Sequence, residues 1–255
     1  MSDWNPEQYK KFLAQRTRPS IDLAERVTIA PRTIFDLGCG PGNSTQILAE
    51  KFPEALVTGG DFSESMLKSA SAAHPDIEFI RFDASRDFSS LDRKFDLIFS
   101  NACIQWVPDH PKLLAEMMDA LNPGGMIAVQ TPLQDKHPMH RLMRETAARP
   151  KWKSLGMTDR DFHNLTQPEY FDALSGISSD FEMWETVYCH RMPSLESIIE
   201  WYRGTGLRPF LAQLTPEQGA EFERDLLEQM ETVYPKQKNG EIMFYFPRLF
   251  FIAYK

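Results

Sequence analysis

The chain has 255 residues, of which 42% are hydrophobic and 25% are charged, proportions that are ordinary for a globular protein. Its net charge of −8 argues against a nucleic-acid partner, because proteins that bind nucleic acids usually present a basic surface. No apolar run is long enough to cross a membrane, and the first residues lack a secretory signal pattern.

The first predicted element is an amphipathic helix over Pro6–Arg16, with Arg16 on its apolar face. The sequence Arg16-Thr17-Arg18-Pro19 is expected to end this helix. We expect residues 1–30 to form a helical arm that lies over a ligand site.

Strands and helices alternate from Arg32 to Pro132, which predicts a parallel sheet. The run Phe95–Ser100 is nearly all apolar, as is typical of a strand covered on both faces. The predicted strands are Thr33–Asp36, Ala55–Asp61, Ile77–Phe82, Phe95–Ser100 and Met126–Gln130, and the predicted helices are Asn43–Lys51, Ser63–Ala73 and His110–Leu121.

After Pro132 the periodicity weakens, but two more strands, Phe181–Arg191 and Glu241–Tyr254, bring the sheet to seven. Pro247 predicts an edge or a bulge in the last strand. We therefore expect an α/β protein with helices on both faces of a mostly parallel sheet. Residues 31–132 form its core, and residues 133–255 add helical cap elements and the last two strands, within one domain overall. The predicted cap helices are Lys136–Arg149, Gln167–Leu174, Leu195–Arg203 and Pro216–Tyr234.

The three cysteines, Cys39, Cys103 and Cys189, are scattered and do not have metal-ligand spacing. Free thiols fit a reducing compartment. We expect a cytoplasmic protein without a metal site, present as a monomer or a weak homo-oligomer.

The most informative stretch is Thr33-Ile34-Phe35-Asp36-Leu37-Gly38-Cys39-Gly40-Pro41-Gly42, where a strand breaks into three glycines at alternate positions. Glycine is needed where the backbone takes positive φ or where a ligand approaches it closely. A turn of this kind holds a ligand over the carboxyl end of a parallel sheet. A dinucleotide fingerprint has the wider spacing G-x-G-x-x-G and binds pyrophosphate. Asp36 would repel pyrophosphate but suits a ligand with an ammonium group.

The run from Asp36 to Gly42 resembles motif I of the S-adenosylmethionine (SAM) dependent methyltransferases. The resemblance implies a Rossmann-like fold, SAM as the cofactor and S-adenosylhomocysteine as its product. An NAD-dependent oxidoreductase would also use an acidic residue at Asp61, but it needs the wider glycine spacing and a second nucleotide-binding half.

A SAM site makes separate demands on the ends of several strands. Asp36 and the Gly38–Gly42 loop are expected to hold the amino-acid end of the cofactor, and Asp61 can accept two ribose hydroxyls. Met66 can pack against adenine, and Asp83 offers a carboxylate to the adenine amino group. The predicted cofactor residues are Asp36, Gly38, Cys39, Gly40, Asn43, Asp61, Phe62, Met66, Asp83, Ala84, Asn101 and Trp106.

Arginines beside prolines and aromatic residues stand out in the segments outside the core. Because arginine binds carboxylates with a planar fork, several around one crevice suit a polyanionic acid. Most other arginines of an acidic protein form surface pairs worth little. The predicted substrate residues are Arg16, Arg208, Arg248, His190 and Tyr202.

Motifs in the arms, where substrate identity resides, look like those of the trans-aconitate 2-methyltransferase family. The similarity extends over nearly the whole chain, with Lys151–Asp159 the segment that matches least. The matching motifs are Trp4-Asn5-Pro6, Tyr9, Arg16-x-Arg18-Pro19, Gln105-Trp106-x-Pro108-Asp109-His110, Gly206-Leu207-Arg208-Pro209 and Phe246-Pro247-Arg248-Leu249-Phe250.

The family resemblance implies methyl transfer from SAM to a carboxylate of a small anionic polycarboxylate such as trans-aconitate. A carboxylic acid with a pKa near ~4 is already ionised at neutral pH, so no general base is expected. Alignment of the reacting atoms is assigned instead to Gln105, Trp106, His190 and Tyr202. Two alternatives remain: a SAM methyltransferase for another small metabolite, and a SAM-binding regulatory protein without catalysis.

Overall fold

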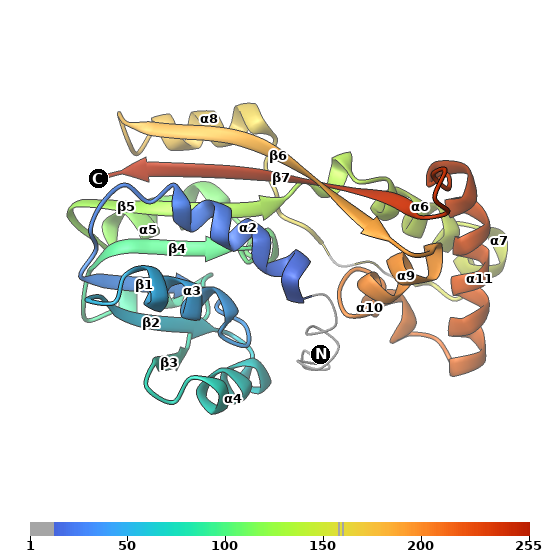
Figure 1. Ribbon diagram of the computed structural model, residues 1–255, viewed down its shortest axis with the longest axis horizontal. Coiled ribbons are helices and arrows are strands. Elements are labelled where there is room, and N and C mark those ends of the chain that lie inside the picture. Colours follow the sequence, from blue (N-terminus) through green and yellow to red (C-terminus); the bar gives the residue numbers. More distant parts are fainter. Residues whose placement is uncertain (1–12, 158, 160) are drawn as a thin grey trace.

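The computed structural model describes residues 13–157, 159 and 161–255, and its centre is one seven-stranded sheet (Figure 1). The strands are β1 (Thr33–Leu37), β2 (Leu56–Asp61), β3 (Glu78–Arg81), β4 (Phe95–Asn101), β5 (Leu121–Pro132), β6 (Phe181–Met192) and β7 (Ile242–Tyr254). Their order in the sheet is β3-β2-β1-β4-β5-β7-β6. Strands β1 to β5 are parallel to one another, whereas β7 is antiparallel to both β5 and β6. The predicted seven-stranded, mostly parallel sheet is confirmed.

Helices connect the strands and continue the chain beyond them. The described α-helices are α2 (Leu13–Glu25), α3 (Asn43–Lys51), α4 (Glu64–Ala73), α5 (His110–Asp119), α6 (Pro138–Ala147), α7 (Pro150–Lys153), α8 (Gln167–Ser175), α9 (Leu195–Arg203), α10 (Arg208–Leu211) and α11 (Pro216–Val233). Short 3-10 helices are η1 (Asp87–Ser90), η2 (Ile104–Trp106) and η3 (Gln134–Lys136). None of these described helices has the length and apolar content needed to span a bilayer.

Two apolar cores cover the two faces of the sheet. On one face, Leu23 of α2 and Leu48 of α3 pack against Leu97 and Phe99 of β4. The other face is covered by α5 and α8, where Tyr170 is fully buried. Because β4 is covered on both sides, five of its seven residues are buried, as its largely apolar sequence predicts.

A third core lies beyond the end of β5 and belongs to the cap. Figure 1 shows β6 and β7 running past β5 to the group of helices α6, α7, α9, α10 and α11. In this third core Phe244 of β7 packs with Tyr202 of α9 and Phe222 of α11. Strand β7 therefore contributes side chains to the cap as well as to both faces of the sheet.

The predicted end of the first helix at Arg16–Pro19 is wrong, because α2 continues through Pro19 to Glu25. Its predicted beginning, from Pro6 to Lys11 and Phe12, lies outside the described residues. A proline inside a helix removes one backbone hydrogen bond. Here the next turn buries Leu23 and Ala24 against the sheet, and this burial offsets the loss.

Of the two outcomes predicted at Pro247, an edge or a bulge, the structure has the edge. Pairing with β6 continues without a register shift from Phe181 to Met192. Pairing with β5 ends one residue away, at Pro132 and Arg248. From Pro247 back to Ile242, strand β7 has β6 on one side but no longer has β5 on the other.

Candidate active site

The glycine turn after β1 is held against the end of β2. The backbone N–H groups of Gly38 and Cys39 both donate to the carbonyl oxygen of Gly60, at 2.8 and 3.1 Å. Gly38 has a φ of 76°, and a Cβ at this position would lie 2.2 Å from the Cβ of Cys103. Glycine is therefore required at position 38 both by backbone conformation and by space.

Asp61, at the end of β2, fixes the next part of the turn. One carboxylate oxygen accepts a hydrogen bond from the N–H of Gly40 at 2.9 Å, and the other accepts one from the N–H of Ser63 at 2.8 Å. Ser63 is the N-cap of α4, as predicted, because its hydroxyl accepts a bond from the N–H of Met66. The acidic residue at the strand end thus couples the turn to the following helix.

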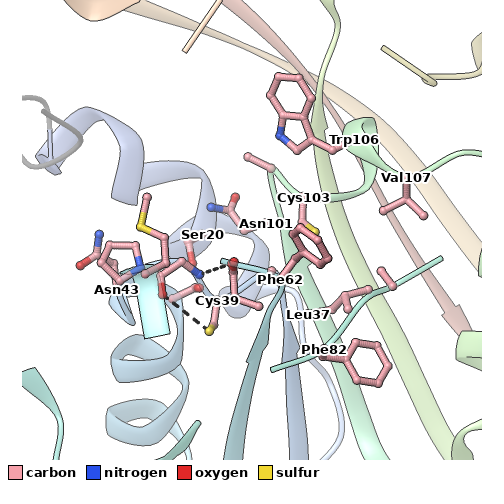
Figure 2. Close-up of a pocket in the computed structure, with 18 of the residues that line it drawn as sticks. Ser20, Leu37, Cys39, Asn43, Phe62, Phe82, Asn101, Cys103, Trp106 and Val107 are labelled. Atoms are coloured by element: carbon pink, nitrogen blue, oxygen red, sulfur yellow. Dashed lines mark hydrogen bonds between the residues drawn. The ribbon is translucent and has the colours of Figure 1, made fainter. Parts of the chain in front are cut away.

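A cavity of about 260 Å³ opens above these strand ends. Figure 2 shows Ser20, Asn101 and Trp106, which come from α2, β4 and η2, among the side chains around it. All of the twelve predicted cofactor residues except Asp36 line this cavity. The lining residues are Arg16, Thr17, Ser20, Leu37, Gly38, Cys39, Gly40, Pro41, Asn43, Ser44, Asp61, Phe62, Met66, Phe82, Asp83, Ala84, Asn101, Ala102, Cys103, Trp106 and Val107.

Asp36 corrects the expectation that its carboxylate reaches the cofactor. Side chains alternate along a strand, so Asp36 points to the same face as Ile34, beneath α3, rather than out of the strand end. The hydroxyls of Ser44 and Thr45 both donate to its Oδ2 atom at 2.7 Å. Burial raises the pKa of Asp36 to about 6, although these two hydrogen bonds act to lower it. Through these two hydrogen bonds, Asp36 holds the first turn of α3 in place beneath the cavity.

A second cavity, of about 100 Å³, adjoins the first and shares Arg16, Ala102 and Trp106 with it. Its other lining residues come from the end of β5, the cap and strand β7. They are Gln105, Pro132, Gln134, His140, Phe162, Trp201, Tyr202, Thr205, Gly206, Phe246 and Arg248.

Two arginines enter the second cavity from opposite ends of the chain. Arg16 of α2 donates from Nη2 to the carbonyl oxygen of Trp201 at 3.0 Å, and its guanidinium lies 4.9 Å from the Trp201 ring. Arg248 of β7 is only 6% exposed and lies 4.1 Å from the ring of Phe246. Contacts with aromatic rings hold both cations in place at the cavity, and the planar guanidinium group is suited to binding a carboxylate.

Three of the four predicted alignment residues, Gln105, Trp106 and Tyr202, also line the second cavity. The side-chain amide of Gln105 donates to the carbonyl oxygen of Ala102 at 2.7 Å, and Tyr202 is almost fully buried. The Tyr202 hydroxyl lies 3.2 Å from Nδ1 of His137. Trp106 packs against Phe162 with the two rings tilted by 38°, and it lines both cavities, so it stands at their junction.

His190 and Arg208 lie outside both cavities, contrary to the sequence prediction. His190 projects from β6 against the ring of Trp201, with ring centres 5.2 Å apart. Burial, with a smaller contribution from Arg248, lowers the pKa of His190 to about 4. Arg208 begins the short helix α10, so its position is set by that helix rather than by the predicted turn.

Several lining residues were not predicted from the sequence, chiefly Thr17 and Ser20 of α2, Gln134 of η3 and His140 of α6. Ser20 lies four residues after Arg16 and therefore on the same helical face. Helical spacing would have identified it had the helix not been ended at Pro19. Gln134 and His140 are not spaced in the sequence so as to share a face with a predicted site residue. Only the tertiary fold brings them to the cavity.

Comparisons with known proteins agree with this arrangement. Residues 34–125 match the model of a methyltransferase domain. The chain is 42% identical to a trans-aconitate 2-methyltransferase of Methylobacterium radiotolerans over 100% of this chain and 99% of that protein. It is also 42% identical to a trans-aconitate 2-methyltransferase of Escherichia coli, over 99% and 98% of the two chains.

The chain belongs to the trans-aconitate 2-methyltransferase family.

Family membership confirms the prediction of a SAM-dependent methyltransferase and excludes the oxidoreductase and the non-catalytic regulator. The Rossmann-like fold is likewise confirmed. The crystal structure of YcgJ from Bacillus subtilis has a TM-score of 0.61 and 14% identity, covering 95% of this chain and 98% of that one. The first cavity also suits SAM, because Oγ of Ser20 and Oδ1 of Asn101 are buried at it and have no hydrogen-bond partner among the described residues.

Proposed function

We propose that this trans-aconitate 2-methyltransferase family member esterifies a carboxylate of trans-aconitate, or of a closely related small polycarboxylic acid. The products are the monomethyl ester and S-adenosylhomocysteine. The observation that carries the proposal is the second cavity, where Arg16 and Arg248 bring two guanidinium groups next to the cofactor cavity. Identity of 42% along the full length of the relatives, cap included, supports the same acceptor class.

On the cofactor side, we assign the amino-acid end of SAM to the glycine turn, Ser20 and Asn101. Asp61 and Asp83 lie at the ends of successive strands, where they can accept hydrogen bonds from ribose and adenine. When bound, SAM supplies a methyl group on a positively charged sulfur. The protein's contribution is to orient this group towards the second cavity and to exclude water.

On the acceptor side, we assign Arg16 and Arg248 to carboxylates that do not react. Attack by a carboxylate on a sulfonium cancels charge, so a guanidinium on the attacking oxygen would stabilise the reactants more than the transition state. The attacking carboxylate is better served by uncharged groups close to Trp106, such as the amide of Gln105 and the hydroxyl of Tyr202. Arg208 and His190 are not assigned, because they lie outside both cavities.

No general base is needed, because the acceptor is already ionised at neutral pH. His110 illustrates why a histidine near the site is not evidence of one. Its Nδ1 lies 2.6 Å from the hydroxyl of Tyr170, and its Nε2 lies 2.8 Å from the carbonyl oxygen of Ile104. Both ring nitrogens are therefore occupied by structural hydrogen bonds.

The proposed function is tested by incubating the enzyme with methyl-labelled SAM and a panel of di- and tricarboxylic acids. We expect label in trans-aconitate, in a product that loses the label under mild alkali because it is an ester. Alkali-stable label, or labelling of none of the acids, would show that the acceptor is another small metabolite.

The assignment of Arg248 predicts a defined kinetic change. Arg248→Lys keeps the charge but removes the planar fork, so the KM for the acid should rise about tenfold while kcat changes little. Steady-state kinetics at saturating SAM measure both constants. Arg191→Lys is the matched control, because Arg191 is exposed on β6 and pairs with Glu241. A loss confined to kcat in Arg248→Lys would contradict the assignment.

We also infer a cytoplasmic enzyme that is monomeric or weakly associated. Its three cysteines are free, which fits a reducing compartment. Cell fractionation and light scattering of the purified protein test the two parts of this inference separately.

A further inference from the structure

Two buried polar side chains of the second cavity have no role in the assignments above. His140 of α6 and Gln134 of η3 are each 5% exposed. Nδ1 of His140 and Oε1 of Gln134 are buried and have no hydrogen-bond partner among the described residues. Leaving such an atom unsatisfied costs about 1–3 kcal/mol, so polar atoms of this kind at a cavity indicate a ligand. An ionised carboxylate only accepts hydrogen bonds, so it can satisfy the His140 nitrogen when that nitrogen carries the proton, but not the Gln134 oxygen.

The His140 ring is fixed in position before any ligand binds. It packs edge-on against Phe162 and Tyr202, with ring centres 5.1 and 5.4 Å away. Gly206 also lies close to the His140 ring, because a Cβ built on this glycine would be 3.3 Å from Cε1 of the ring. Phe162 also packs against Trp106, so a single ring separates His140 from the junction of the two cavities.

His140 is uncharged at neutral pH, in contrast to the two arginines of the same cavity. Burial, and to a smaller extent Arg144, lowers its pKa to about 3. The charged and titratable groups around it are His137 and Arg144 from its own segment, Tyr202 of α9, and Arg16 and Arg248 across the cavity. The neutral imidazole retains one N–H that can donate a hydrogen bond.

The chemistry of the transfer distinguishes neutral donors from charged ones. A bond forms between a carboxylate oxygen and the methyl carbon, the bond from that carbon to sulfur breaks, and its electron pair stays on the sulfur. No proton moves, and the negative charge of the attacking oxygen is lost. As this charge disappears, the hydrogen bond from a neutral N–H to the attacking oxygen weakens less than one from a guanidinium does.

We propose that His140 is the positioning residue that donates a hydrogen bond to the carboxylate receiving the methyl group. Arg16 and Arg248 hold the other carboxylates, and the amide of Gln134 completes the pocket. This inference rests on the proposed function. It also makes His140 responsible for selecting which carboxylate of the acid is esterified.

The test compares His140→Phe, which keeps a ring without a donor, with His140→Gln, which restores a neutral N–H. We expect kcat for the acid to fall about tenfold in His140→Phe, because the attacking oxygen is no longer held in line with the methyl group, with a smaller change in KM. The product should become a mixture of monomethyl ester isomers, which proton NMR distinguishes. His140→Gln should recover most of kcat and of the isomer ratio. Affinity for S-adenosylhomocysteine, measured by calorimetry, should stay at the wild-type value in both variants.

The inference is overturned if His140→Phe keeps the wild-type kcat and isomer ratio, or if kcat and S-adenosylhomocysteine affinity fall together with no change in isomers. If His140→Phe does not fold, His140→Leu replaces it as a variant that fills the space without a donor, and an unchanged isomer ratio in that variant overturns the inference. Failure of the wild-type enzyme to esterify any polycarboxylic acid would overturn the proposed function instead.

Discussion

At the scale of single residues, the glycine turn shows how a motif combines different physical requirements. Gly38 and Gly40 both have positive φ, at 76° and 54°. A Cβ at Gly38 would collide with Cys103, whereas no atom lies within 4 Å of the corresponding position at Gly40. The sequence shows glycine at both positions. It does not show whether a side chain would be excluded by a clash with a neighbour or disfavoured by the positive φ of the backbone.

This difference predicts unequal effects of two alanine substitutions. Gly40→Ala should cost about 1–2 kcal/mol of unfolding free energy, the cost of a left-handed non-glycine residue. Gly38→Ala adds a clash with Cys103 and should cost about 3 kcal/mol or more and weaken S-adenosylhomocysteine binding. Urea unfolding and calorimetry measure the two quantities. Equal costs in the two variants would contradict the steric account.

Asp36 gives a second residue-scale prediction, through its pKa. Its pKa in the folded protein is about 6, above the ordinary 3.8, so the folded protein holds the proton more tightly than the unfolded chain. The resulting stabilisation is present below pH 3.8 and is lost as the pH rises through 6. Asp36→Asn stays neutral and can still accept from Ser44 and Thr45.

The Asp36→Asn variant should therefore be more stable than the wild type at pH 8, by up to about 3 kcal/mol, and of similar stability at pH 4. Urea unfolding at the two pH values tests this. A variant that is less stable than the wild type at pH 8 would show that the ionised carboxylate is favoured in the folded protein.

At the scale of elements, the strands of the core follow directly from sequence because apolar runs and strand-end acids mark them. The first strand, for example, was predicted over Thr33–Asp36 and is found over Thr33–Leu37. Helix α2 was not predictable in the same way. The local sequence predicts that the helix ends before Pro19. The longer helix is favourable only because Leu23 is buried against a sheet whose strands come later in the chain.

The role of this burial can be tested on α2 itself. Leu23 is fully buried, so Leu23→Ala should cost about 2–5 kcal/mol. Because Thr17 and Ser20 reach the cofactor cavity from the same helix, the variant should also bind S-adenosylhomocysteine more weakly. Ile21→Ala is the matched control, since Ile21 is 37% exposed. Comparable losses in both variants would show that α2 is held by something other than its sheet-facing side.

At the scale of the whole molecule, three apolar cores share one sheet. The division into residues 1–30, 31–132 and 133–255 stays a prediction. The acceptor cavity lies where sheet, cap and α2 meet, which explains why sequence located the cofactor residues better than the acceptor residues. Cofactor residues follow strand ends in order, whereas His140 and Arg248 are brought together only by the cap core, to which α6, α9 and β7 all contribute side chains.

The buried histidines of the cap make the stability of the molecule depend on pH. Burial lowers the pKa of His140 to about 3 and that of His137 well below its usual range. As the pH falls below about 6.5, the unfolded chain takes up protons that the folded chain does not, so the free energy of unfolding decreases. The raised pKa of Asp36 acts in the opposite direction.

This linkage is measurable by urea unfolding between pH 6 and pH 5. His140→Gln should lose about 1 kcal/mol less than the wild type over this interval, because the variant lacks one of the groups that protonate only on unfolding. Equal losses would show that His140 is protonated to the same extent in the folded and unfolded states.

Strand β7 lies between β5 and β6 in the sheet but follows both in the chain. During synthesis on the ribosome, β6 therefore leaves the exit tunnel before the strand that joins it to the sheet has been made. A nascent chain can complete the glycine turn and the parallel strands early, but it has no Arg248 and no closed cap until β7 emerges. All residues that line the first cavity are thus synthesised well before β7, whereas the second cavity is incomplete until Phe246 and Arg248 of β7 have been added.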